Sequence, residues 1–186
     1  MSKTFYVCSY GGSGSWLLVN HLKKFGTSHH IHTRKPSNKL CEVDGEHFTN
    51  KHVDDLTNHH VVFIYSEPEY SIHCNDSFSE RHWINIGVDP KIISSREDYV
   101  RDDIDKVKYE EFFDNYYKLK ERNYDIVFIR FEKMWSNLNK IEQFLNVSFD
   151  GFPENKYRDT PKKISKMPIY NNFRDRINNM ESVFRL

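Results

Sequence analysis

The stretch that decides the fold is Thr4-Phe-Tyr-Val-Cys-Ser-Tyr10, followed by Gly11-Gly-Ser-Gly14 and then by Trp16-Leu-Leu-Val-Asn-His-Leu-Lys-Lys24. The first run is rich in β-branched and aromatic residues, which predicts a strand, and the third has apolar residues at helical spacing. The sequence therefore predicts a strand, a glycine-rich turn and a helix. Such a turn gathers backbone N–H groups and a helix N-terminus at one point, which favours the binding of an anion.

The rest of the chain alternates between predicted strands and helices. Val61-Val-Phe-Ile-Tyr65 and Asp125-Ile-Val-Phe-Ile-Arg-Phe131 are nearly continuous apolar runs, typical of strands buried on both faces of a parallel sheet. Between the first strand and these two, a second short strand is predicted over 29–33. This alternation predicts an α/β fold, with a three-layer α/β/α arrangement around a mostly parallel sheet, in a single domain over residues 1–186.

Three later segments have helical patterns. A helix is predicted within residues 97–121, another over 138–145 with Ser136 as its N-cap, and a short one over 170–183. The expected apolar stripe of the first of these helices consists of Phe112, Phe113, Tyr116 and Leu119.

The composition is that of a compact domain with no net charge. The 186 residues include 27 Lys and Arg against 27 Asp and Glu, and 15% of them are aromatic. These residues suffice for a core, which excludes disordered, collagenous and coiled-coil proteins. Because no basic face outweighs the acidic middle of the chain, we expect no nucleic-acid partner.

Charge is unevenly distributed along the sequence. Residues 1–60 carry a net charge of +2, residues 61–155 carry −7 and residues 156–186 carry +5. This pattern is compatible with an ordinary mixed surface, and also with a basic tail that covers an anion bound by the first segment.

Cysteine usage and hydropathy bear on the compartment. Cys8, Cys41 and Cys74 are an odd number of cysteines at irregular spacing, which favours reduced thiols over a disulfide framework. No apolar run approaches the roughly 20 residues that span a bilayer, and the first residues run straight into a predicted strand. We therefore expect a cytoplasmic protein with no membrane partner.

The glycine turn departs from two common phosphate-binding motifs. A Walker A loop needs Lys and then Ser or Thr directly after its last glycine, whereas Ser15-Trp16 follows Gly14 here. The dinucleotide motif needs a further glycine where this sequence has Leu17. Taken alone, the turn is equally compatible with glycines that serve only the backbone angles of a strand-to-helix connection.

Four segments, in order, resemble the sulfotransferase family. Ser9-Tyr-Gly-Gly-Ser-Gly-Ser-Trp-Leu17 is similar to the family's 5′-phosphosulfate loop, and His30-Ile-His-Thr-Arg-Lys-Pro36 to the segment that carries a catalytic histidine. Val61-Val-Phe-Ile-Tyr-Ser-Glu-Pro68 resembles the strand that leads to the 3′-phosphate site. Phe128-Ile-Arg-Phe-Glu-Lys-Met134 resembles the family's late strand before a helix. The likeness is closest to short sulfotransferase-like proteins of algae and large DNA viruses.

The resemblance implies a P-loop NTPase-like sulfotransferase fold, and transfer of a sulfuryl group to a hydroxyl of a small molecule or glycan. The implied cofactor is 3′-phosphoadenosine 5′-phosphosulfate, which leaves as 3′,5′-bisphosphoadenosine, and no metal is required. The implied catalytic residues are His32, as the base, and Ser15. The implied cofactor-binding residues are Gly11, Gly12, Ser13, Gly14, Ser15 and Trp16 for the 5′-phosphosulfate, and Ser66, Arg81 and Arg158 for the 3′-phosphate.

Two positions depart from the family pattern. Gly12 stands where many members carry Lys or Arg, and Ser66 stands where the arginine for the 3′-phosphate usually falls. Arg34 or Lys35, together with the loop amides, is a candidate replacement for the missing cation. A nucleotide-binding module without transfer activity and an atypical P-loop kinase therefore remain alternative functions.

Histidines cluster at the predicted second strand. His29, His30 and His32 invite a metal site, but strand alternation places His30 and His32 on one face and His29 on the other. No carboxylate or cysteine at ligand spacing joins them, so we expect no metal there. His59 and His60 precede a buried strand and are expected to be exposed.

Overall fold

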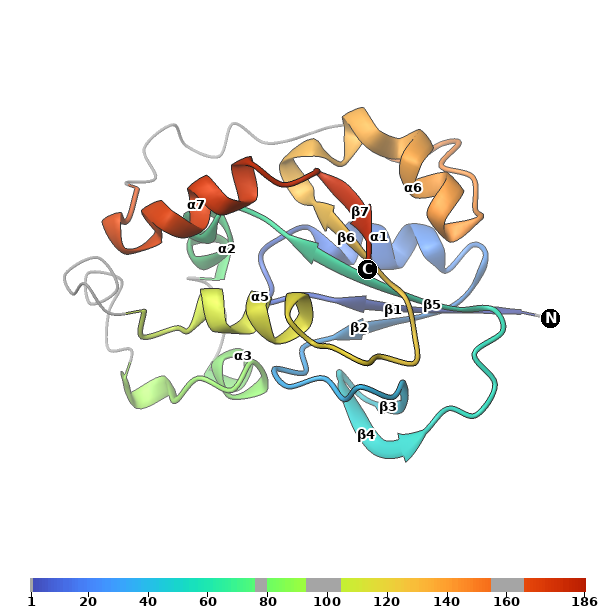
Figure 1. Ribbon diagram of the computed structural model, residues 1–186, viewed down its shortest axis with the longest axis horizontal. Coiled ribbons are helices and arrows are strands. Elements are labelled where there is room, and N and C mark those ends of the chain that lie inside the picture. Colours follow the sequence, from blue (N-terminus) through green and yellow to red (C-terminus); the bar gives the residue numbers. More distant parts are fainter. Residues whose placement is uncertain (1, 76–79, 93–104, 155–165) are drawn as a thin grey trace.

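The computed structural model describes residues 2–75, 80–92, 105–154 and 166–186, and its centre is a five-stranded sheet (Figure 1). The spatial order of the strands is β2-β1-β5-β6-β7. Neighbours are parallel except that β7 runs antiparallel to β6. The strands are β1 Lys3–Cys8, β2 Gly26–Ile31, β5 His59–Tyr65, β6 Ile126–Arg130 and β7 Val183–Arg185.

Helices cover both faces of this sheet. The α-helices are α1 Ser15–Leu22, α2 Pro68–Asn75, α3 Glu80–Asn85, α5 Tyr109–Tyr117, α6 Leu138–Leu145 and α7 Asn171–Asn178. Single 3-10 turns are Pro90–Ile92, Phe131–Lys133, Trp135–Asn137 and Pro168–Tyr170. The apolar side chains of α1 and α6 pack on one face, and those of α3, α5 and α7 pack on the other.

The sheet strands are apolar on both faces because both faces are covered. Along β5, Val62 and Ile64 point toward α1 and α6, whereas Val61, Phe63 and Tyr65 point toward α5. This alternation of two buried faces explains the continuous apolar runs in the sequence. The predicted α/β fold with a mostly parallel sheet is confirmed, and its layers are compatible with an α/β/α arrangement.

A separate hairpin lies beside the end of β2 (Figure 1). Its antiparallel strands are β3 Cys41–Asp44 and β4 His47–His52. Two hydrogen bonds attach it to the segment after β2: the His32 N–H donates to the Glu46 carbonyl, and the Phe48 N–H donates to Thr33 Oγ1, each over 2.8 Å. The hairpin therefore packs next to the carboxyl end of β2, and the sequence patterns did not predict it.

Several details of the predicted elements were wrong. The helix α6 begins after a 3-10 turn that contains Ser136, whose hydroxyl donates to the Lys133 carbonyl instead of capping the helix. Leu119 lies beyond the end of α5, whereas the other three residues of its stripe are buried. The strand β7 follows α7 within the last residues and was also not predicted.

The sheet order creates a switch point between β1 and β5. The chain leaves β1 for β2 on one side and then returns to β5 on the other side. In sheets wound in this way, ligands bind in the crevice outside the carboxyl ends of the two strands at the switch point. The glycine loop lies there, since the Ser13 hydroxyl donates to the Ile64 carbonyl of β5 over 3.3 Å.

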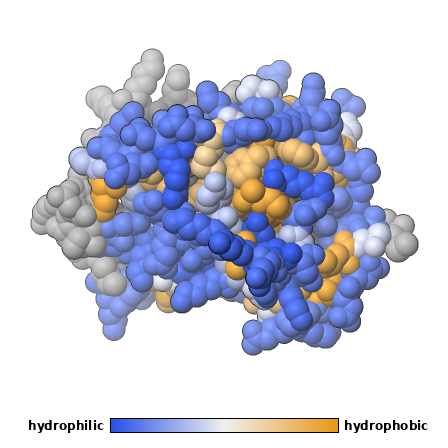
Figure 2. Space-filling view, viewed as in Figure 1, coloured by the Kyte–Doolittle hydropathy of each residue, from blue (hydrophilic) through white to orange (hydrophobic). Residues whose placement is uncertain are grey.

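The face shown in Figure 2 is mainly hydrophilic, with hydrophobic residues gathered near the centre of the view, where Figure 1 places β7 and the C-terminus. Leu186, the last residue, is one of the exposed large apolar side chains. Within the described ranges, no helix has both the length and the apolar character needed to cross a membrane.

Candidate functional site

The glycine loop connects the carboxyl end of β1 to the first residue of α1. Gly11, Gly12 and Gly14 all have positive φ angles, of 108°, 67° and 68°. Residues with a Cβ avoid this conformation, so each glycine serves the backbone path. At Gly14 space is also lacking, because a Cβ would lie 2.1 Å from Cε2 of Phe131. The loop thus leads directly into a helix N-terminus at the switch point, which is the arrangement of an anion site.

The serines of the loop are buried and bonded to one another or to the sheet. The Ser9 hydroxyl donates to Ser15 Oγ over 3.0 Å, and the Ser13 hydroxyl donates to the Ile64 carbonyl of β5. Trp16 follows on the outer side of α1 and is 53% exposed, with its ring 4.7 Å from that of His30. Of the predicted loop residues, Trp16 therefore offers the most open surface.

His30, predicted only to share a face with His32, is the histidine that contacts Ser15 of the loop. Its Nε2 lies 2.7 Å from Ser15 Oγ, and the residue is 8% exposed. The parallel pairing of β1 with β2 brings this about, because Val7 of β1 lies opposite His30. Strand alternation placed His30 and His32 on one face, as observed, so the sequence contained the signal for His30 as well.

His32, the predicted base, lies directly behind His30, with ring centroids 4.3 Å apart. Its Nδ1 is 2.7 Å from the Ser9 carbonyl, so Nδ1 carries the proton and Nε2 is the basic atom. Burial is the main cause that lowers the pKa of His32, while the bond to Ser9 opposes it. The imidazole is therefore neutral at neutral pH.

The hairpin turn adds a carboxylate to these two histidines. Glu46 Oε1 lies 3.9 Å from Nδ1 of His30, and Glu46 Oε2 accepts a hydrogen bond of 3.0 Å from Asn85 Nδ2. The expectation that no carboxylate joins the histidines was thus wrong. Glu46 lies 14 positions beyond His32 in the sequence, and the hairpin brings it back to the histidines.

Ser66, predicted to contact the 3′-phosphate, lies after the carboxyl end of β5 and is fully buried. Its hydroxyl is 2.5 Å from that of Ser71, and its carbonyl accepts a hydrogen bond from the Tyr109 hydroxyl. Arg81 lies in α3, but its side chain is outside the described part, and Arg158 falls in the segment 155–165, which is also outside it. The 3′-phosphate site stays a prediction.

Of the two candidate replacements for the missing loop cation, Lys35 is exposed and Arg34 is held by other groups. Arg34, a candidate replacement for the missing loop cation, donates from Nε to the Ile86 carbonyl over 2.6 Å and pairs with Glu111. Arg130, at the end of β6, is buried between Glu67 and Glu132 at 3.2 and 3.3 Å. Burial raises the pKa of Glu132. Since the Ser13 hydroxyl donates to Ile64, the described loop offers an anion its backbone amides and the Ser15 hydroxyl.

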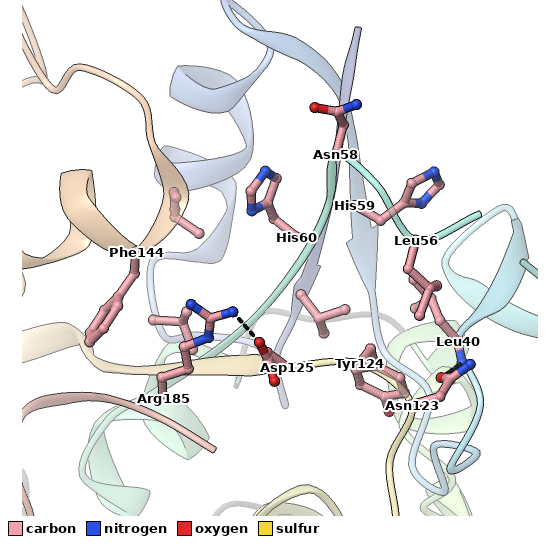
Figure 3. A pocket seen from close by; sticks show the side chains of 13 residues that line it. Leu40, Leu56, Asn58, His59, His60, Asn123, Tyr124, Asp125, Phe144 and Arg185 are labelled. Atoms are coloured by element: carbon pink, nitrogen blue, oxygen red, sulfur yellow. Dashed lines mark hydrogen bonds and ion pairs between the residues drawn. The ribbon is translucent and has the colours of Figure 1, made fainter. Parts of the chain in front are cut away.

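A separate cavity of about 360 Å³ lies at the other end of the sheet (Figure 3). His59 and His60 line it from the start of β5, and the ion pair of Asp125 with Arg185 borders it. Both histidines are half-buried, contrary to the expectation that they are exposed. Because the glycine loop follows the carboxyl end of β1, this cavity is distinct from the candidate site.

Comparisons with models of protein families, with curated proteins and with solved structures found no match. The candidate site therefore rests on the geometry of this chain, namely a glycine loop, a helix N-terminus and a group of two histidines and one glutamate.

Proposed function

We propose that the chain is a sulfotransferase that binds 3′-phosphoadenosine 5′-phosphosulfate at the glycine loop and transfers its sulfuryl group to a hydroxyl acceptor. The observation that carries the proposal is the loop itself, in which Gly11, Gly12 and Gly14 have positive φ angles. It opens into the N-terminus of α1 at the switch point between β1 and β5. The family resemblance of four ordered segments supports the same function.

The proposed reaction is a displacement at sulfur. The acceptor oxygen forms a bond to sulfur while the bond from sulfur to the bridging oxygen breaks, and its electron pair leaves with the phosphate of 3′,5′-bisphosphoadenosine. The proton of the acceptor hydroxyl moves to Nε2 of His32, since Nδ1 is bonded to Ser9. Backbone N–H groups after Gly12 stabilise the negative charge that grows on the departing phosphate.

The contact between His30 and Ser15 determines whether the Ser15 hydroxyl can donate a hydrogen bond to a bound anion. When Nε2 of His30 carries a proton, it donates to Ser15 Oγ, and the Ser15 hydroxyl is then oriented to donate elsewhere. Ser15 is the first residue of α1, where an anion meets the helix dipole. The pair therefore supplies the loop with a hydroxyl donor beside its backbone amides.

One alternative function is favoured by specific contacts. Arg34, one candidate for the missing loop cation, is bonded to the Ile86 carbonyl, and Ser66, at the position of the missing 3′-phosphate arginine, is bonded to Ser71. This favours a nucleotide-binding module that has the loop but lacks transfer activity. The atypical P-loop kinase is the remaining alternative. A comparison of nucleotide ligands distinguishes it from the sulfotransferase.

Thermal unfolding with different nucleotides tests the binding part of the proposal. With a chelator present, 3′,5′-bisphosphoadenosine at 100 times its Kd is expected to stabilise the native state by about 2.7 kcal/mol. The loop variant Gly12→Ala should weaken this effect, because φ is 67° there, whereas Gly151→Ala, at the same φ angle and with open space around it, is the matched control. Stabilisation by ATP with Mg²⁺ but not by the bisphosphate would overturn the proposal in favour of a kinase.

Turnover decides between the enzyme and the inactive module. Labelled cofactor is supplied with a panel of small hydroxyl and glycan acceptors, and the product is followed with the unmodified chain and with His32→Ala. We expect transfer to at least one acceptor and a loss of about 10²–10⁴-fold in rate for the variant. Binding of the bisphosphate without transfer to any acceptor would instead establish the module.

A further inference from the structure

We propose that His30, His32 and Glu46 form a binding site for Zn²⁺ with one coordination position open to solvent. One ligand atom from each of the three residues lies within 4.8 Å of the other two. The ligands come from two parts of the fold, since the histidines belong to β2 and the residues directly after it, and Glu46 belongs to the hairpin turn. The site goes beyond the proposed function, which requires no metal.

Each ligand is oriented by a hydrogen bond through its other polar atom. Nδ1 of His32 donates to the Ser9 carbonyl over 2.7 Å, which leaves Nε2 as the ligand atom. Nε2 of His30 bonds to Ser15 Oγ over 2.7 Å, which leaves Nδ1. Ligating histidines in metal sites are held in this way, by a backbone carbonyl or another polar group on the outer nitrogen.

The carboxylate of Glu46 is oriented in the same manner. Oε2 accepts a hydrogen bond from Nδ2 of Asn85 in α3, which leaves Oε1 directed at Nδ1 of His30. Three ligands with three separate outer partners make a preorganised group, which is how ligands are held in metal sites.

The distance between the proposed ligand atoms of His30 and Glu46 is close to the distance between two ligands of one ion. Nδ1 of His30 and Oε1 of Glu46 are 3.9 Å apart, which is too long for a hydrogen bond. Two ligands of a tetrahedral Zn²⁺ with bonds of about 2.0–2.1 Å lie about 3.3 Å apart. Small side-chain movements therefore bring the ligands to bonding distance.

The ligand types indicate which ion this site would bind, and the exposure of Glu46 indicates how the ion would enter. Two imidazoles and one carboxylate are the ligands of Zn²⁺ sites that keep a fourth position for water. Both histidines are buried, whereas the side chain of Glu46 is 39% exposed, so the ion has access from the hairpin side. On the proposed function, a bound ion would occupy Nε2 of His32 and so deprive the reaction of its base. Added Zn²⁺ would then inhibit transfer, a consequence that rests on that function.

Metal titration of the chain without nucleotide tests the site. The chain is first stripped with a chelator. Zn²⁺ is then titrated by calorimetry, and Co²⁺ is used as a spectroscopic probe, because its visible absorption is strong in four-coordinate sites. We expect one ion per chain, and an affinity at least about 10–100 times lower for Glu46→Gln and His30→Gln. Glu46→Gln keeps an oxygen for the Asn85 bond, so circular dichroism should show an unchanged fold.

Two matched controls lie in the same hairpin. Glu42 pairs with Lys51 on the hairpin surface, and His52 is exposed at the end of β4. Glu42→Gln and His52→Gln should bind the ion as the unmodified chain does. Absence of stoichiometric binding would overturn the proposal, as would binding that survives Glu46→Gln or that is lost equally in His52→Gln. Nucleotide binding is measured with a chelator and metal binding without nucleotide, so failure of one proposal is distinguishable from failure of the other.

Discussion

Replacement of Gly14 by alanine is the sharpest test of how the glycine loop is built. The residue has φ of 68°, and a Cβ on its backbone would lie 2.1 Å from Cε2 of Phe131 and 2.6 Å from Cδ2. Phe131 is buried at the end of β6, where Tyr70 stacks on its ring and Trp135 packs at 5.3 Å. The ring therefore has little freedom to move aside.

Two costs add in this variant. A left-handed backbone with a Cβ costs about 1–2 kcal/mol. Forcing an extra methyl group into a packed region costs about 1–3 kcal/mol more. We therefore expect Gly14→Ala to lower the free energy of unfolding by about 2–5 kcal/mol, which is a large part of the about 5–15 kcal/mol typical of a domain.

Equilibrium unfolding in urea, followed by tryptophan fluorescence, measures this loss. Gly45→Ala is the matched control, because φ there is 60° and no atom lies within 4 Å of the added Cβ. It should show only the backbone cost. The double variant Gly14→Ala with Phe131→Ala makes room for the methyl group, so its loss should be smaller than the sum of the two single losses.

Equal losses for Gly14→Ala and Gly45→Ala would refute the reasoning, because they would mean that the loop does not rest on Phe131. Additive losses in the double variant would refute it independently.

Three other perturbations have definite expected results. Arg174→Met should cost about 3–5 kcal/mol in urea unfolding, because it leaves the buried carboxylate of Glu69 without its ion pair. The added change Glu69→Leu should recover only part of this loss, because the Met167 N–H then lacks its acceptor. Phe128→Ala removes a fully buried ring that stacks on Phe184 and should cost about 3–5 kcal/mol by the same measurement. Burial is the main cause that lowers the pKa of His21, so the unfolded chain takes up a proton at this residue at a higher pH than the folded chain does. The free energy of unfolding should therefore fall as the pH drops from about 6.5 toward the folded pKa. His21→Gln should reduce the slope of the free energy of unfolding against pH by at most about 1.4 kcal/mol per pH unit.

The main elements of the fold could be predicted because their signals are local. The apolar runs at 61–65 and 125–131 became the adjacent central strands β5 and β6, since a strand covered on both faces is apolar throughout. The hairpin was missed because β3 and β4 are polar strands that pair only with each other. The strand β7 was missed because three residues at the edge of the sheet carry too short a pattern.

Local sequence signals also account for part of the candidate site, and tertiary packing accounts for the rest. The sequence by itself determined the glycine loop, because positive φ angles before a helix demand glycine, and it determined that His30 and His32 share a face, because side chains alternate along a strand. Only the tertiary structure decided that His30 contacts Ser15, since this depends on the pairing of β1 with β2. It also decided that Glu46 joins the histidines, because no local pattern specifies which distant turn packs against the end of a strand.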